Sequence, residues 1–306
     1  CSFLFKKSGF TDAEVRTIEN VSHANAFEVL YTPLTRPENP FTQLITAEDP
    51  QQFYRSYAYD VTPPRDNSPF FFHTVRLRQL WGSLFLSWES KKTNVGLLVL
   101  FSVFLAALAL ALLFLLFPLF WFRKEAFSRQ AGPAVGYFVC LGLGFILIEM
   151  TLVQKFILFL GRPVYALSIV LFSTLLFSGL GSFCSARLSS EHLRRNISMI
   201  CLLISALTLA YLPLLPFFLY RLVGLTTVLK ALLSIAFLAP LGFVMGMPMP
   251  LGINWLRRTS PALIPWAWGM NGAASVLGSI LTMVIGVNFG FNQALILAIG
   301  LYISAI

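Results

Sequence analysis

Six uninterrupted apolar runs occupy residues 95–306 and limit the possible folds of this chain more than any other feature. A transmembrane helix needs about 20 mostly apolar residues, because the hydrocarbon core of a bilayer is about 30 Å thick. A seventh run begins at Phe291, and the residues from there to 306 extend only about 24 Å as a helix. The sequence therefore predicts a mainly α-helical membrane protein with six full transmembrane helices and a partial seventh. The six runs are 95–122, 133–160, 163–184, 197–220, 225–247 and 266–286.

The composition supports a membrane protein and indicates which partners to expect. Hydrophobic residues make up 57% of the chain and charged residues 11%, far from the balance of soluble domains. Residues 91–306 hold fourteen basic and three acidic side chains, and the basic ones lie mostly in the loops between apolar runs. A nucleic-acid surface would need these charges on one folded face. We therefore expect the lipid bilayer as a partner, other membrane subunits as further candidates, and no nucleic acid.

The loop charges also predict an orientation. Alternate loops lie on the same side of a membrane, so eight of the loop cations fall on one side, which the positive-inside rule assigns to the cytoplasm. The N-terminal domain then lies outside the cytoplasm, and we expect the protein to span the cell membrane several times. The eight cations are Arg123, Lys124, Arg129, Arg187, Arg194, Arg195, Arg257 and Arg258.

Residues 1–94 divide into a small α/β domain, residues 1–60, and a proline-rich strap, residues 61–94. We expect strands at 3–5 and 27–31. We expect a helix at 11–26, because Thr11 and Glu14 match a capping box. The apolar run after Cys1 reads as an interior strand of a larger domain that precedes it. The strap, which contains three consecutive phenylalanines at 70–72, is expected to pack on this domain and lead into the transmembrane domain, residues 95–306.

No catalytic or metal-binding constellation is evident in the sequence. The cysteines and the histidines His23, His73 and His192 lack ligand spacing, so we predict no metal site. The sequence also lacks the motifs of a nucleophile elbow, a phosphate-binding loop and a dinucleotide-binding fingerprint. The sequence thus names no catalytic residue.

Glu149 is the first candidate for an intramembrane polar site. It lies near the middle of the second apolar run, where a carboxylate is costly enough to suggest a function. It would bind a proton or a cation, or alternatively fix helix packing through a hydrogen bond to another helix, and the sequence leaves both open. In either case we expect Glu149 to be shielded from lipid and to contact another helix. Lys155 lies about 9 Å along the same helix and is a poor partner.

Two further groups of residues complete the candidate set. Pro240, Gly242, Gly246 and Pro248 predict a kink or a break near the end of the fifth run. Transporters build binding sites from broken helices, whereas a simple kink near a helix end is the alternative. In the sixth run Asn271 and Ser275 recur at helical spacing, which favours helix packing over a substrate path. With Glu149 and Gln154, they form the candidate intramembrane polar site.

Three segments together resemble the C-terminal part of bacterial multi-pass membrane proteins with a spermidine-synthase-like domain, sometimes described as fused major-facilitator and spermidine-synthase proteins. They are the strap from Pro63 to Phe72, the stretch from Gly142 through Glu149 and Gln154 to Gly161, and the stretch from Trp266 through Asn271 to Gly278. The resemblance implies that residues 1–60 end a Rossmann-like transferase domain. The strap differs from the family in carrying Asn67 after Asp66, where the family has an acidic pair.

The resemblance leaves two functions open. One is a membrane-tethered aminopropyltransferase or methyltransferase that uses S-adenosylmethionine or its decarboxylated form, with catalytic residues before Cys1. The other is a transporter-like or scaffold module, in which the synthase-like domain has a regulatory or assembly role. The loop charges discriminate between them, because these cofactors are made in the cytoplasm and the predicted orientation puts the soluble domain on the other side.

Overall fold

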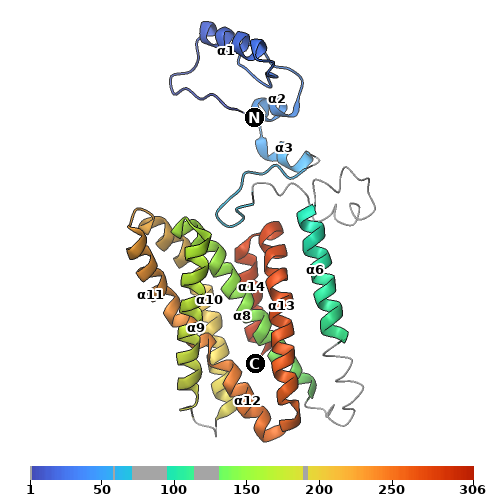
Figure 1. Cartoon of the computed structure of the whole chain (residues 1–306), viewed down its shortest axis with the longest axis vertical. Helices are drawn as coiled ribbons and strands as arrows, with labels where there is room; N and C mark the ends of the chain where they lie inside the picture. The colour runs from blue at the N-terminus through green and yellow to red at the C-terminus, as the bar shows by residue number, and fades with distance from the viewer. Residues whose placement is uncertain (1, 58, 71–94, 114–130, 189–191) are drawn as a thin grey trace. The chain divides into compact units, whose positions relative to one another are not determined.

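A computed structural model describes residues 2–57, 59–70, 95–113, 131–188 and 192–306 (Figure 1). These residues fall into two units: an N-terminal unit that ends at Pro63, and a helical unit that begins at Pro64.

The N-terminal unit contains three short helices, each started by a side-chain cap. They are α1 (Asp12–Ala24), α2 (Pro40–Thr46) and α3 (Pro50–Ser56). The predicted capping box of α1 is confirmed: Glu14 N–H donates to the Thr11 hydroxyl, and the Glu14 carboxylate accepts from Thr11 N–H. At the starts of α2 and α3 the side chains of Asn39 and Asp49 accept from Thr42 N–H and Gln51 N–H, and each cap is followed by a proline that needs no N–H partner.

The prediction of two strands in this unit is wrong. Residues 3–5 and 27–31 form no strand, and no strand occurs in the part of the chain that the structure describes. A strand needs a second strand for its backbone hydrogen bonds, and neither segment has one among these residues. Phe3 is 80% exposed and Phe5 95% exposed, so their apolar character reflects no buried strand here.

The helical unit follows the predicted apolar runs closely. It comprises α6 (Val95–Ala111), α8 (Ala131–Leu160), α9 (Pro163–Ser185), α10 (Leu193–Leu222), α11 (Thr227–Met245), α12 (Pro248–Thr259), the 3-10 turn η3 (Pro261–Leu263), α13 (Ile264–Phe289) and α14 (Phe291–Ser304).

Five helical segments in the described ranges are long and apolar enough to cross a membrane, so the chain is a multi-pass membrane protein. They are Gly132–Leu160, Pro163–Ser185, Leu193–Leu222, Thr227–Thr259 and Pro261–Phe289. Five of the six predicted full spans are thereby confirmed. The first predicted span coincides with α6, but its second half extends to residues outside those described. The partial seventh is α14.

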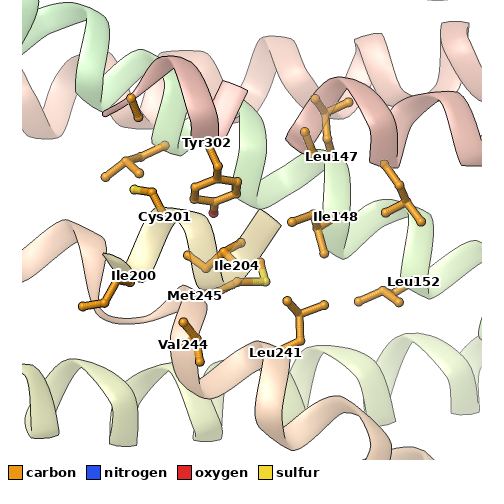
Figure 2. Close-up of a cluster of buried hydrophobic side chains, with 14 of the residues drawn as sticks. Leu147, Ile148, Leu152, Ile200, Cys201, Ile204, Leu241, Val244, Met245 and Tyr302 are labelled. Carbon is orange, nitrogen blue, oxygen red and sulfur yellow. The ribbon is translucent and has the colours of Figure 1, made fainter. Parts of the chain in front are cut away.

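Helix α8 is the central helix of this unit, packed against α9, α13 and α14 (Figure 1). Over an apolar stretch of 18 residues, 56% of α8 is buried inside the protein, whereas the corresponding share of α9 is 28%. Figure 2 shows part of the core, where the Tyr302 ring of α14 lies beside Cys201 and Ile204 of α10. The buried Tyr302 ring also packs on α8 at Gly144, where no larger side chain fits.

Candidate functional site

Glu149 is buried between α8 and α9. Glu149 is 6% exposed, and its Oε1 atom forms a hydrogen bond of 2.7 Å with the Thr174 hydroxyl of α9. The expectation that Glu149 is shielded and contacts another helix is therefore confirmed. A hydrogen bond across helices is the usual solution for a polar group in a membrane, because lipid offers no partner.

Thr174 also links Glu149 to the third helix at this point, α11. Gly242 of α11 faces Thr174 so closely that a Cβ atom on Gly242 would lie 3.5 Å from the Thr174 Cα atom. The same Cβ atom would lie 3.3 Å from the Phe177 Cβ atom. A glycine here lets α11 approach α9 directly beside the partner of Glu149.

The residues of the predicted helix break lie around the junction of α11 and α12, which comes one turn after Gly242. Helix α11 ends at Met245 with Gly246 as its cap, and α12 begins at Pro248. Pro240 is accommodated inside α11. The backbones of α9 and α11 nearly touch at this break, because a Cβ atom on Gly246 would collide with the Ser178 carbonyl and one on Gly181 with the Phe243 carbonyl.

Asn271 and Ser275 join α13 to the other side of α8. The Asn271 side-chain amide donates to the Phe138 carbonyl over 3.2 Å. The Ser275 hydroxyl lies 3.3 Å from the Gly142 carbonyl and 3.0 Å from the Asn271 carbonyl. Gly142 packs against the Asn271 backbone with no space for a side chain. These residues hold two helices together, as the packing interpretation predicted.

The four predicted polar residues do not form one site. Gln154 faces α13, where its amide lies 3.7 Å from the Met283 sulfur, a weak contact. Gln154, Asn271 and Ser275 thus belong to the contact between α8 and α13, whereas Glu149 belongs to the contact between α8 and α9.

Sequence reasoning missed a second polar cluster, centred on Lys155. The Lys155 side chain is 7% exposed, and its Nζ atom donates to the Asn292 side-chain oxygen of α14 over 2.8 Å. Asp66 of the strap interacts electrostatically with it. The signal in the sequence was a lysine inside an apolar run together with the polar start of the seventh run, Asn292 and Gln293.

The strap completes this cluster by closing the ends of two helices. Residues Arg65 and Ser68 pair their backbones in a tight turn, with Ser68 N–H donating to the Arg65 carbonyl over 2.8 Å. The Asn67 side-chain oxygen accepts from Asn292 N–H over 2.8 Å, and its backbone carbonyl accepts from Phe291 N–H over 2.9 Å. We expected the strap to pack on the N-terminal domain, but residues Pro64 to Phe70 belong to the helical unit.

Ser68 lies at the end of the preceding helix. Its hydroxyl is 3.4 Å from both the Gly286 and Val287 carbonyls in the last turn of α13. Gly290 separates α13 from α14 with φ of 89°, a conformation that favours glycine, and the Asn67 side chain leaves no space for a Cβ atom there. The strap therefore fits a junction that only glycine can form.

Two concave regions lie apart from these polar clusters. A cavity of about 10 Å³ between α8, α10 and α11 is lined mainly by apolar side chains, including Phe156, Leu215 and Phe237, and is about the size of one water. A shallow groove of about 390 Å³ lies along α1 beside Phe10 and Thr17. Within the described residues, no three His, Cys, Asp or Glu side chains gather as metal ligands.

Comparisons of this chain with protein-family models, with curated proteins and with solved structures find no match.

Proposed function

We propose that the helical unit is a membrane scaffold that holds the strap leading from the N-terminal unit. The observation that carries this proposal is the docking of the turn Arg65–Ser68 on the junction between α13 and α14. There the strap caps both helices at once, through Asn67 on the first N–H groups of α14 and Ser68 on the last carbonyls of α13.

These contacts supply partners to the N–H groups of Phe291 and Asn292 and add one at the end of α13, where the Gly286 carbonyl also accepts from Gly290 N–H. The first N–H groups and the last carbonyls of a helix have no partner within the helix. Gly290, the residue before α14, has no side chain with which to cap it. The turn Arg65–Ser68 of the strap therefore forms part of the folded helical unit, and its contacts with α13 and α14 hold it in place.

The intramembrane polar groups also favour a scaffold. Asn271 and Ser275 are engaged in helix contacts, and Lys155 is bonded to Asn292. Groups used in this way stabilise a fixed arrangement of helices. A transport role is the second candidate, favoured by the position of Glu149 and Thr174 beside Gly242, one turn before the break between α11 and α12.

Membership of the spermidine-synthase-like membrane family is part of the proposal. The segments that carry the resemblance contact one another within the helical unit, for example Gly142 with Asn271. On this proposal the protein lies in the bacterial inner membrane, other membrane subunits are possible partners, and a transferase domain in a longer protein would use S-adenosylmethionine or its decarboxylated form.

Proteolysis of the protein in membrane vesicles tests the scaffold. Asn67→Ala removes the side-chain cap of α14, and we expect trypsin to cut after the adjacent Arg65 several times faster than in the wild type, as measured by peptide mass spectrometry. Thr62→Ala is the matched control, because the Thr62 hydroxyl bonds only to Asp60, within the N-terminal unit. Equal cleavage rates in the wild type and Asn67→Ala would show that the strap is not held by this contact.

A further inference from the structure

The Thr174 hydroxyl has three acceptors within reach and a single proton. Its Oγ1 atom lies 2.7 Å from Glu149 Oε1, and within α9 it lies 2.9 Å from the Val170 carbonyl oxygen and 3.2 Å from the Leu171 carbonyl oxygen. A hydroxyl donates one hydrogen bond and accepts others. Whether the Thr174 proton goes to Glu149 or to a carbonyl oxygen of α9 therefore depends on whether Glu149 carries a proton itself.

An ionised Glu149 would be poorly compensated. Thr174 would donate to it, and the described residues supply no other hydrogen bond and no ion pair to this carboxylate. Lys155 lies almost two turns away along α8 and donates to Asn292. Helices α9, α13 and α14 carry no charged residue, while Lys230 of α11 donates to the Phe159 carbonyl near the end of α8. The arginines of α10 and α12 are in their terminal turns, at Arg194, Arg195, Arg221, Arg257 and Arg258.

A protonated Glu149 satisfies the same geometry without a charge. The carboxylic acid donates its proton to Thr174 Oγ1, and Thr174 then donates to the Val170 carbonyl. Both donors have an acceptor at a normal distance, and no charge is buried in a region where an unpaired charge is costly.

We infer that Glu149 is a proton-binding site: in the folded protein at neutral pH it holds a proton, which it donates to Thr174, while Thr174 donates to the Val170 carbonyl. Loss of this proton reverses the donation by Thr174 and places a negative charge where α8, α9 and Gly242 of α11 meet. Occupancy by a proton therefore stabilises the contact between these three helices. This inference is independent of the scaffold proposal, because it concerns the protonation state of one carboxyl group and not the docking of the strap.

Labelling with a hydrophobic carbodiimide gives the first test. Such a reagent enters apolar surroundings and reacts with protonated carboxylic acids, whose O–H group adds across its C=N bond. The full chain in lipid vesicles is treated at neutral pH, and labelled peptides are identified by mass spectrometry. We expect label on Glu149 and none on Glu14, an exposed carboxylate paired with Lys6 that serves as an internal control. Glu149→Gln should abolish the label.

Infrared spectroscopy gives a test that does not depend on access of the reagent. We expect the wild type to show the C=O band of a protonated carboxylic acid that Glu149→Gln removes and Thr174→Val shifts to higher frequency, since the hydrogen bond is lost. Ser178→Ala in the same helix is the control, because its hydroxyl bonds only to the Leu175 carbonyl. A carboxylate band from Glu149 in place of the C=O band would overturn the inference. So would a band that appears only when sodium is removed, which would indicate a cation site.

Discussion

The side-chain oxygen of Asn67 accepts a hydrogen bond of 2.8 Å from the backbone N–H of Asn292, a residue 225 positions later in the chain. The Asn292 side chain in turn accepts a hydrogen bond from the buried Lys155 ammonium. One continuous set of contacts thus connects the strap, the first turn of α14 and the central helix α8. The strap makes its contacts at the start of α14, where N–H groups need an acceptor from elsewhere.

Replacing Asn67 tests what this acceptor contributes. Asn67→Asp keeps an oxygen at the same place, and the N-terminus of a helix favours a negative charge, so we expect the free energy of unfolding to change by only a few tenths of a kcal/mol. Asn67→Ala removes the cap and should lower the free energy of unfolding by about 1 kcal/mol. Chemical unfolding in mixed micelles measures both. Equal losses for Asp and Ala would mean that the shape of asparagine matters and its acceptor does not.

Gly181 provides a test of the contact between α9 and α11. Gly181→Ala places a methyl group against the Phe243 carbonyl, so the helices must separate, and overpacking of this kind typically costs about 1–3 kcal/mol. Gly179→Ala is the matched control, since a Cβ atom there meets nothing within 4 Å. The free energy of unfolding of Gly181→Ala should therefore be lower than that of Gly179→Ala by this overpacking cost. A Gly181→Ala protein as stable as Gly179→Ala would contradict the close approach.

Asn271 tests the opposite contact of α8. Asn271→Leu removes the hydrogen bond to the Phe138 carbonyl and should lower the free energy of unfolding by about 0.6 kcal/mol, the average for such bonds between membrane helices. Ser279→Ala, in the same helix, removes the hydroxyl of a half-buried residue that bonds to the Val276 carbonyl within α13, and it should have no measurable effect. A loss for Ser279→Ala as large as for Asn271→Leu would argue against a specific role of the amide.

The sequence was most informative where the cause of a structure is local. The start of α9 at Pro163, the capping box of α1 and the break between α11 and α12 depend on residues within a few positions of one another, and all were predicted. Which helix faces which was not predictable, because transmembrane helices are apolar on all sides and carry little periodicity.

The contacts of the candidate site illustrate the same limit. The burial of Glu149 followed from the cost of a carboxylate in a membrane, but its partner Thr174 lies in another helix and no local pattern identifies it. The docking of Asn67 on α14 joins distant parts of the chain through backbone groups, and these have no sequence signal at all. The strands were mispredicted from short apolar runs, without knowledge of a pairing partner.

The N-terminal unit makes a prediction about pH. The Lys6 ammonium and the Thr11 backbone N–H both donate to the Glu14 carboxylate and lower its pKa from 4.5 to about 2. A carboxyl whose pKa is lower in the folded state stabilises the fold above its unfolded pKa, and this contribution is lost as pH falls from 4.5 through about 2.

Helix α1 should therefore become less protected in acid. We expect Glu14→Gln to increase hydrogen exchange of the first-turn amides of α1 at neutral pH, and the difference from the wild type to shrink as the pH falls below 4.5. Glu28→Gln, beyond the end of α1, is the control and should leave these amides unchanged. A difference that is constant from neutral pH to about 2 would show that the charge of Glu14 does not matter.

The orientation predicted from the loop charges can be tested at the two ends of one segment, Thr227–Thr259. In a cysteine-free background, Thr226→Cys marks the end before α11, and Thr259→Cys marks the end beside Arg257 and Arg258; both positions are exposed. Because basic loops stay in the cytoplasm, a membrane-impermeant maleimide added to intact cells should label Thr226→Cys and should label Thr259→Cys only after the cells are opened. The reverse pattern would place the N-terminal unit in the cytoplasm, where S-adenosylmethionine is made, and would favour the transferase. Labelling of both positions in intact cells would mean that this segment does not cross the membrane.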